Sequence, residues 1–525
     1  MFIHIAFLLS SLLSVTPPDQ FVFNNGVEAE TLDPHRLTSV NDSLLALQMF
    51  EGLVGMDSTY MKVEPAIASH WEVSKDGLKY TFTIRKGLKW SNGDALTPEQ
   101  VRNSFIRAMA PEVANPNLEN YTHNIEGAAE YVKNYSTPQQ KDFEAKLGIT
   151  LKGKDQIEIK IKKPSALFLN YLADPRCAVV HPSMWKQDSK AWTHPEEFIV
   201  NGPYKLKEWV VNKQIVLEKN KNYREASKVK IETIVALPIN DQTTTYNLYR
   251  TKQIDWTGEN TLASTYVSSL RADSEFFLTG AFGTYAYALN VKIKPLDNLK
   301  VRKALSLAIH RAEITDKVLK SGVIPTSRLV PPGLDGFKPP IEPPQPFDRQ
   351  IEQAKTLLAQ AGYPDGKGFP TLTLNYNTNE QHHKVAQAIQ QMWKKYLNID
   401  VKLDNREWKV FLAEQAQKKY EISRQAWIGE IPDAGDYMEA YLADGPNNHT
   451  NWGNAQFDRI LRDAHLIRDA KKRNEATAKA EKIILDDAPI IPIYHYVFYS
   501  LMSPRIQGFK PNMFGKYQFK YFTKK

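Results

Sequence analysis

A strand–helix–strand pattern in residues 371–405 constrains the fold of this chain most strongly. Residues 371–377 (TLTLNYN) and 399–405 (IDVKLDN) are typical of strands, and a helical stretch lies between them near residues 381–396. Elements joined in this order form a βαβ unit, in which the crossover is right-handed and the two strands are parallel. We therefore expect a parallel α/β arrangement in the second half of the chain.

The first half of the chain shows a different periodicity. Apolar and polar residues alternate strictly in residues 80–85 (YTFTIR), 157–162 (IEIKIK) and 215–218 (IVLE). This pattern is typical of antiparallel strands with one solvated face. A β-rich first half and an α/β second half predict at least two lobes. The length of 525 residues suggests roughly three to four domains, or one large composite fold.

Two helices and one long loop complete the prediction. Helical spacing of apolar residues predicts helices over residues 301–320 and 351–361, and Gly362 is expected to end the second helix. Residues 331–346 contain seven prolines. Because proline fits neither helix nor sheet interiors, this segment is expected to be a surface loop.

The composition narrows the class of protein. Hydrophobic residues make up 42% and charged residues 24%, which is typical of a soluble globular chain. The net charge of +8 arises from basic residues interspersed with acidic ones, so no nucleic-acid partner is expected. The single cysteine, Cys177, excludes an intramolecular disulfide and a Cys-rich zinc site, and is interpreted as a buried structural thiol.

The chain begins with an apolar segment. Residues 2–15 are almost wholly apolar or small, and Pro17-Pro18-Asp19 ends the run. About 14 such residues are too few for a stable membrane span, so residues 1–19 are predicted to be a secretory signal peptide. An N-terminal core strand and a lasting anchor remain the alternatives. A lipoprotein would need a cysteine directly after the segment, and the only cysteine, Cys177, lies far downstream, so a lipoprotein is not expected.

Catalytic and metal-binding motifs are missing from the sequence. It contains no GxxxxGK[ST], GxSxG, GxGxxG or HExxH pattern. His382 and His383 are adjacent, and neighbouring residues of a helix point about 100° apart, so no shared metal ion is expected. Several carboxylates in residues 430–444 leave a hydrolase open, but we interpret them as a solvated loop with at most one ligand anchor. We expect neither an enzyme nor a cofactor.

Several longer stretches carry a resemblance to a known family. The chain resembles the bacterial extracellular solute-binding proteins of family 5, the peptide- and nickel-binding family, and especially its oligopeptide-binding members. The resemblance covers essentially the whole chain after the leader. It rests on residues 23–35 (FNNGVEAETLDPH), 65–105, 201–209 (NGPYKLKEW), 298–311 (NLKVRKALSLAIHR), 357–374 and 376–412.

The resemblance implies an architecture and a role. It implies an α/β, bilobal type II periplasmic-binding-protein-like fold with an additional inserted domain. By resemblance the first lobe comprises residues 20–50, 190–280 and 493–525, the inserted domain residues 51–189, and the second lobe residues 281–492. It also implies a periplasmic, monomeric protein that delivers short peptides to the permease subunits of an ABC importer in the inner membrane.

The resemblance further implies where a peptide ligand binds. In the family an extended peptide lies in the cleft between the lobes and pairs with protein backbone, which is β-augmentation. The matching backbone segments lie around Val40 and around Ala426, Trp427 and Ile428. Trp408 and Trp427 match tryptophans that form the walls of ligand pockets in the family.

The residues that are expected to bind the charged ends of the ligand show where this chain departs from the family that it resembles. Glu430 stands where the family usually has Asp as the partner of the peptide ammonium, and Asp433 is a second candidate. Arg424 and His382 match positive groups that bind the peptide carboxylate, whereas Gln415 replaces a third, usually Arg. These departures leave two hypotheses for the ligand: an ordinary short peptide, or another compound such as a cell-wall peptide, a metal chelate, haem or glutathione.

Overall fold

The computed structural model describes residues 16–185 and 192–525, and the predicted leader in residues 1–15 lies outside the described residues. The chain divides into two compact units. Within the described residues, the first comprises residues 16–263, 272–277 and 499–525, and the second residues 264–271 and 278–498. The finer division of the first unit into a lobe and an inserted domain stays a prediction.

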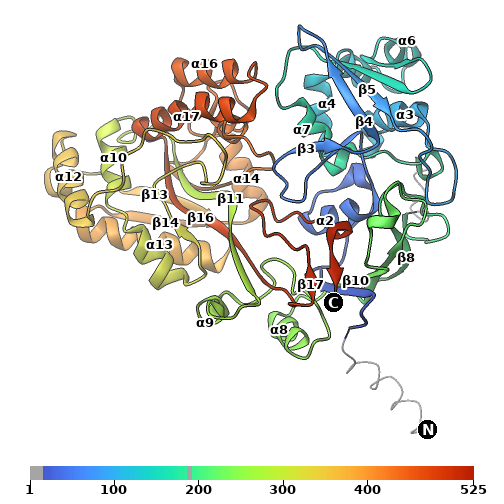
Figure 1. The fold of residues 1–525 in the computed structure, drawn as a ribbon. Helices are drawn as coiled ribbons and strands as arrows, with labels where there is room; N and C mark the ends of the chain where they lie inside the picture. Colours follow the sequence, from blue (N-terminus) through green and yellow to red (C-terminus); the bar gives the residue numbers. More distant parts are fainter. Residues whose placement is uncertain (1–15, 186–191) are drawn as a thin grey trace. The chain divides into compact units, whose positions relative to one another are not determined.

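The first unit contains three small sheets and a two-stranded ribbon near the C-terminus (Figure 1). Its helices are α2 (Val40–Met49), α3 (Pro98–Met109), α4 (Leu118–Asn124), α5 (Ala128–Lys133), α6 (Gln140–Ala145), α7 (Phe168–Leu172) and α8 (Gln242–Arg250). Its strands are β1 (Gln20–Asn24), β2 (Val54–Met56), β3 (Val63–Pro65), β4 (Ala68–Val73), β5 (Lys79–Ile84), β6 (Ile149–Lys152), β7 (Gln156–Lys160), β8 (Tyr204–Val210), β9 (Gln214–Lys219), β10 (Thr233–Leu237), β17 (Ile506–Gln507) and β18 (Thr523–Lys524).

The predicted antiparallel strands of the first half are confirmed. Strands β4, β5, β7 and β6 form an antiparallel sheet in that order, and β5 and β7 contain the alternating segments. A second sheet has the order β1-β10-β9-β8, in which β1 and β10 are parallel and the other pairs are antiparallel. In β5 the residues buried against the core alternate with partly exposed ones, as a sheet with one wet face requires.

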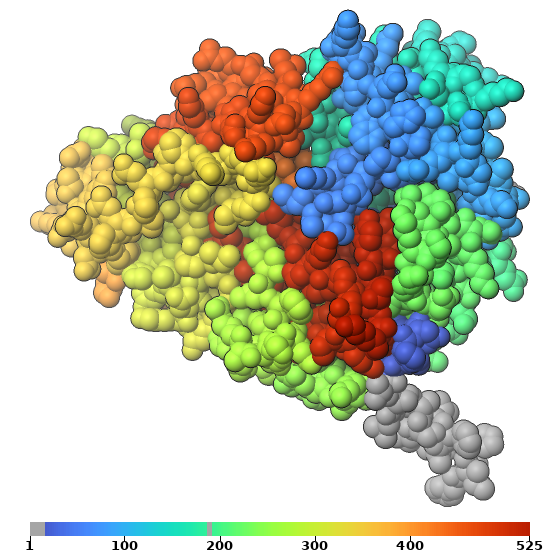
Figure 2. Space-filling view, viewed as in Figure 1, coloured from blue at the N-terminus to red at the C-terminus, as the bar shows by residue number. Residues whose placement is uncertain are grey.

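The C-terminal segment completes the core of the first unit. Phe519 packs edge-on against Phe21 of β1, with ring centroids 5.0 Å apart, and both side chains are fully buried. Figure 2 shows this segment, in red, next to blue and green residues of the same unit. The Lys524 ammonium reaches the carboxylate of Asp255 at 2.8 Å and the Thr16 hydroxyl at 2.7 Å. Thr16, which the prediction places in the leader, is therefore packed inside this unit.

The second unit is built on one mixed sheet. Its helices are α9 (Val267–Leu270), α10 (Leu299–Leu307), α11 (Arg311–Glu313), α12 (Phe347–Gln360), α13 (Glu380–Leu397), α14 (Trp408–Ala416), α15 (Ala434–Met438), α16 (Ala455–Ala464) and α17 (Ala470–Asp487). Its strands are β12 (Ile324–Pro325), β13 (Leu372–Asn377), β14 (Val401–Arg406) and β15 (Ile422–Ile428), together with most of β11 (Phe276–Leu289) and β16 (Ile490–Leu501). Strand β11 begins in the first unit, and β16 ends in it.

The predicted βαβ unit is confirmed. Strands β13 and β14 are parallel, and α13 connects them. The full sheet has the order β12-β16-β11-β15-β13-β14, and α10, α12 and α13 contribute apolar residues to the core that forms on it, among them Val301, Leu358 and Trp393. The predicted helix over residues 351–361 corresponds to α12, and Gly362 follows it with a φ of +98°. Residues 331–346 contain neither a helix nor a strand, as predicted.

The predicted continuous helix over residues 301–320 is wrong. Helix α10 ends at Leu307, and a short α11 and a π-helix at residues 314–319 follow. The His310 side chain caps α11, because its Nδ1 accepts a hydrogen bond from the Glu313 backbone at 3.2 Å. A new helix therefore begins where the apolar spacing alone predicts a continuation.

The helices of residues 16–185 and 192–525 were also compared with the requirements of a membrane span. None of them has both the length and the apolar composition that crossing a bilayer requires.

Candidate ligand-binding site

The carboxyl end of β15 offers an open strand edge within the second unit. Residues 426–428 pair with residues 283–285 of β11, but the ladder from β15 to β13 extends only to Ser423. Among the described strands, none pairs with residues 426–428 on the β13 side. Since half of the peptide groups in a strand face each edge, this edge can accept an extended peptide as an added strand.

Apolar side chains are exposed in β15 and in helix α14 of the same unit. The side chain of Ile428 is 53% exposed, and that of Trp408, the first residue of α14, is 48% exposed. Trp427 is half-buried. Single exposed apolar side chains are common on protein surfaces, whereas contiguous exposed apolar patches mark binding surfaces. The exposure of Trp408 agrees with its predicted place at a ligand site and argues against the alternative of core packing.

Arg424 lies in the same strand, inside a cluster of aromatic side chains. Its Nη2 donates to the Tyr496 hydroxyl at 3.1 Å, and its guanidinium lies 5.1 Å from the centre of the Tyr285 ring. Its Nε is buried and has no partner among the described residues, and no carboxylate of the described chain forms an ion pair with it. A buried cation is stable only when an anion or hydrogen-bond acceptors compensate its charge. This position is therefore suited to an anionic ligand group.

His382 lies close to Arg424. It belongs to the first turn of α13, and its ring centre is 5.4 Å from that of Tyr285. Burial and, to a smaller extent, the charge of Arg424 together lower the pKa of His382 to about 4. The imidazole is neutral at pH 7, so Arg424 and the start of α13 supply the positive potential at this site.

Gln415 lies inside the second unit. The Gln415 side-chain amide donates to the Arg424 carbonyl at 2.8 Å and to the Ser423 hydroxyl at 3.1 Å, and the residue is only 7% exposed. Both of its amide hydrogens are thus engaged by β15. Gln415 holds the strand that carries Arg424, and its predicted contact with a ligand stays a prediction.

The two carboxylates proposed as partners of a ligand ammonium differ in their surroundings. Glu430 is exposed, two residues beyond the end of β15. Asp433 is 1% exposed; its carboxylate caps α15 and forms an ion pair with the buried Arg473. Because Glu430 is exposed and Asp433 is buried, the geometry favours Glu430 as the partner of a ligand ammonium.

Val40 is the one predicted ligand-site residue in the first unit. It is the first residue of α2 and is 63% exposed. The side chain of Ser39 caps this helix. The exposure of Val40 is compatible with its predicted role, which stays a prediction.

Two other hypotheses, a nucleophilic Cys177 and a metal site, gain no support from the described residues. Burial raises the pKa of Cys177 to about 12, so its thiol is a poor nucleophile. No group of three or more His, Cys, Asp or Glu side chains suited to a metal ion occurs in the part of the chain that the structure describes.

The sequence prediction missed the aromatic surroundings of Arg424. Tyr285 and Tyr287 stand at alternate positions of β11, and Tyr494 and Tyr496 at alternate positions of β16. Alternate strand residues share one face, so the patterns YAY and YHY could have revealed a tyrosine-rich surface. Only the sheet order, with β11 between β15 and β16, shows that this surface meets Arg424.

The open strand edge of β15, the exposed Trp408 and the uncompensated Arg424 are together typical of a ligand-binding protein with an α/β fold. A model of the bacterial extracellular solute-binding proteins, family 5 middle region, matches residues 62–449. The chain belongs to this family.

Individual relatives agree with this assignment. The periplasmic oligopeptide-binding protein OppA of Salmonella typhimurium is 33% identical over 498 residues, which cover 93% of this chain and 89% of OppA. The unliganded open form of MppA, a periplasmic murein tripeptide binding protein, matches with a TM-score of 0.84 at 30% identity. The match covers 97% of this chain and 98% of the MppA chain. OppA of Haemophilus influenzae in complex with the peptide RPPGFSPFR has a TM-score of 0.73 at 30% identity, covering 97% of this chain and all of its own.

Proposed function

We propose that this protein is the extracytoplasmic solute-binding component of an ABC importer and that it binds short peptides. Its family supports this role, as do relatives that are named for oligopeptide binding. In this proposal the protein works in the periplasm as a monomer and passes its ligand to permease subunits in the inner membrane.

One observation carries the choice of a peptide over a neutral solute. Arg424 is buried without a carboxylate partner on the same strand whose last residues have an open edge. An extended peptide supplies both missing partners: its backbone pairs with residues 426–428, and its terminal carboxylate compensates Arg424. Because the main chain provides these contacts, the binding tolerates different ligand side chains. Water molecules in the side-chain pockets would adapt to each sequence.

A cell-wall peptide is the second candidate ligand, favoured by the likeness to MppA. Such a ligand carries further carboxylates. Calorimetric competition between a plain tripeptide and a murein tripeptide separates the two candidates. Tighter binding of the plain tripeptide supports the first, and tighter binding of the murein tripeptide supports the second.

The first test of the proposal is mass spectrometry of compounds that co-purify with the protein, followed by calorimetry with a tripeptide mixture after unfolding and refolding. We expect bound peptides in the extract and a saturable heat signal. We expect the peptide to be recovered intact after long incubation, because the proposed role is binding and not hydrolysis. An extract without peptide, together with a flat titration, would overturn the proposal.

A further inference from the structure

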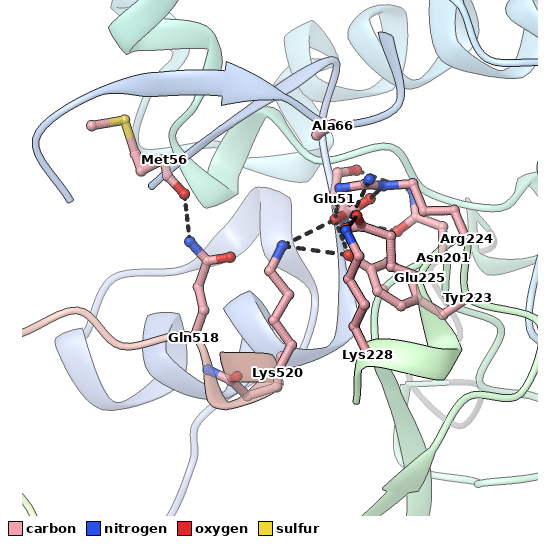
Figure 3. A network of polar contacts seen from close by, with 12 residues as sticks. Glu51, Met56, Ala66, Asn201, Tyr223, Arg224, Glu225, Lys228, Gln518 and Lys520 are labelled. Atoms are coloured by element: carbon pink, nitrogen blue, oxygen red, sulfur yellow. Dashed lines mark hydrogen bonds and ion pairs between the residues drawn. The ribbon is translucent and has the colours of Figure 1, made fainter. Parts of the chain in front are cut away.

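A cavity of about 450 Å³ lies in the first unit, and no residue of the proposed peptide site lines it. The ribbon of β2 and β3, the segment around residues 173–178 and the C-terminal segment around residues 518–521 form its walls. Glu51 is one of the residues that line it, and Figure 3 shows Glu51 between Arg224 on one side and Lys520 on the other. Four basic residues line the cavity: Arg85, Arg224, Lys228 and Lys520.

The Glu51 carboxylate is already saturated with donors. It accepts hydrogen bonds from the Tyr223 hydroxyl at 2.6 Å and from Arg224 Nε and Nη2 at 2.8 and 3.0 Å. Burial alone would raise the pKa of Glu51, but the charges of Lys520 and Arg224 outweigh it and hold the pKa below its usual value. Glu51 is therefore ionised, and Tyr223 and Arg224 occupy both of its carboxylate oxygens.

The other carboxylates around the cavity are also engaged, with one exception. Glu225 pairs with Lys228 at 2.6 Å and with Arg224 at 2.9 Å. Asp174 binds Arg176 through both of its oxygens, each at 2.7 Å. Only the exposed Glu64, at the rim, has no ion pair among the described residues.

Two cations that line the cavity keep unused hydrogen-bond donors. The side chain of Lys520 is 13% exposed, yet the polar contacts of its ammonium are long: 3.6 Å to Glu51 and 3.4 Å to the Tyr223 hydroxyl. Its Nζ also lies 5.2 Å from the centre of the Tyr521 ring. Arg85 donates to the Ala66 carbonyl through Nε at 2.9 Å, and its two terminal nitrogens have no partner within the described residues. An ammonium has three donors and a guanidinium five, so donors outnumber acceptors here.

We propose that this cavity is a second ligand site, which binds a small oxyanion, a carboxylate or a phosphate, through Lys520 and Arg85. An oxyanion supplies the acceptors that both cations lack, and the planar guanidinium matches its geometry. Glu51 does not take up these unused donors, because Arg224 and the Tyr223 hydroxyl already bind its carboxylate. Lys520 lies in the C-terminal segment and Arg85 directly after β5, so the anion would link these two parts of the unit.

The test compares anions at constant ionic strength. Thermal unfolding is followed in sodium phosphate, in sodium citrate and in sodium chloride, and affinity is measured by calorimetry. We expect phosphate or citrate, but not chloride, to raise the unfolding temperature, because a ligand that binds only the folded state stabilises it. The anion with the tighter binding identifies the ligand as a phosphate or a carboxylate. Equal shifts in all three salts would overturn the proposal.

Variants locate the site. We expect Lys520→Gln and Arg85→Gln each to weaken anion binding by about tenfold, the effect of losing one charge-assisted contact. The exposed Lys213 of the same unit provides the control Lys213→Gln, which should bind as the wild type does. If Lys520→Gln does not fold, Arg85→Gln alone tests whether the anion binds in this cavity. Unchanged anion affinity in both cavity variants would overturn the assignment, and peptide titrations of the same samples report on the proposed function separately.

Discussion

Glu430 and Asp433 give opposite predictions for substitution, although they lie three residues apart. Asp433 is buried and paired with Arg473, whereas Glu430 is exposed beyond the end of β15. We expect Asp433→Asn to lower stability without changing the affinity of the folded protein. We expect Glu430→Gln to lower affinity without changing stability.

The magnitude for Asp433→Asn follows from the surroundings of the ion pair. Side-chain exposure is 5% for Arg473 and 1% for Asp433, so removal of the carboxylate leaves a buried charge uncompensated, at a cost of about 3–5 kcal/mol. Asn retains the oxygen that caps α15, so the change removes the charge and little else. For a unit of this size, that loss lowers the unfolding temperature by about 6–20 °C.

The magnitude for Glu430→Gln follows from a charge-assisted contact with the ligand ammonium. Such a contact contributes about 1.5–3 kcal/mol, which corresponds to about a 10- to 100-fold weaker affinity. Calorimetry with a tripeptide and with its N-acetylated form isolates this contact. Only the tripeptide with a free amine should bind Glu430→Gln more weakly than the wild type.

Asp444→Asn is the matched control for stability. Its carboxylate pairs with Arg462 but is 76% exposed, so its loss should cost less than about 1 kcal/mol. The reasoning would be refuted if Asp433→Asn unfolded at the wild-type temperature. It would also be refuted if folded Asp433→Asn lost affinity for the free-amine peptide and kept it for the acetylated one, since Asp433 would then be the ligand partner.

Three further predictions concern other buried ionisable side chains. Arg424→Gln should weaken binding of a tripeptide by about 10- to 100-fold and leave its C-terminally amidated form unaffected, as calorimetry would show. Burial, with a contribution from the Arg107 charge, lowers the pKa of His35 to about 4, so the unfolded chain takes up a proton near pH 6.5 and the folded chain does not. Stability should therefore fall by roughly 2–3 kcal/mol between pH 6.5 and 4.5, and urea titrations of His35→Gln should show a flatter profile. Asp255→Asn should cost about 3–5 kcal/mol and expose the C-terminal segment to proteolysis, whereas the additional change Lys524→Met should restore part of that stability.

The parts of the fold that the sequence predicts are those in which local periodicity and packing agree. The βαβ unit of residues 371–405 could be predicted because alternation defines β13, helical spacing defines α13, and the handedness rule fixes their connection. The same reasoning fails for helix α10, which ends at Leu307 although the apolar spacing predicts that it continues to residue 320. There a single side chain, His310, caps a new helix, and the apolar spacing carries no information about that hydrogen bond.

Contacts between distant segments could not be predicted from the sequence. Asp255 binds Lys524 and the hydroxyl of Thr16, so three segments from the beginning, middle and end of the chain share one buried cluster. Each of these residues alone is typical of a solvated surface. Their burial depends on the parallel pairing of β1 with β10 and on the return of the C-terminal segment, which are properties of the whole unit.

At the candidate site, the sequence predicts which residues matter but does not predict the contacts that they make. Arg424, His382 and Gln415 were all identified by resemblance, but their roles differ because of the neighbours that the sheet order supplies. Tyr285 and Tyr496 surround Arg424 without neutralising it, which leaves its charge for a ligand. Gln415 gives its hydrogens to β15 and so stabilises the strand that presents Arg424. An arginine at position 415 would place a second buried cation beside the first, which is unfavourable without a further carboxylate. The loss of that charge is thus consistent with a site in which one arginine binds one ligand carboxylate.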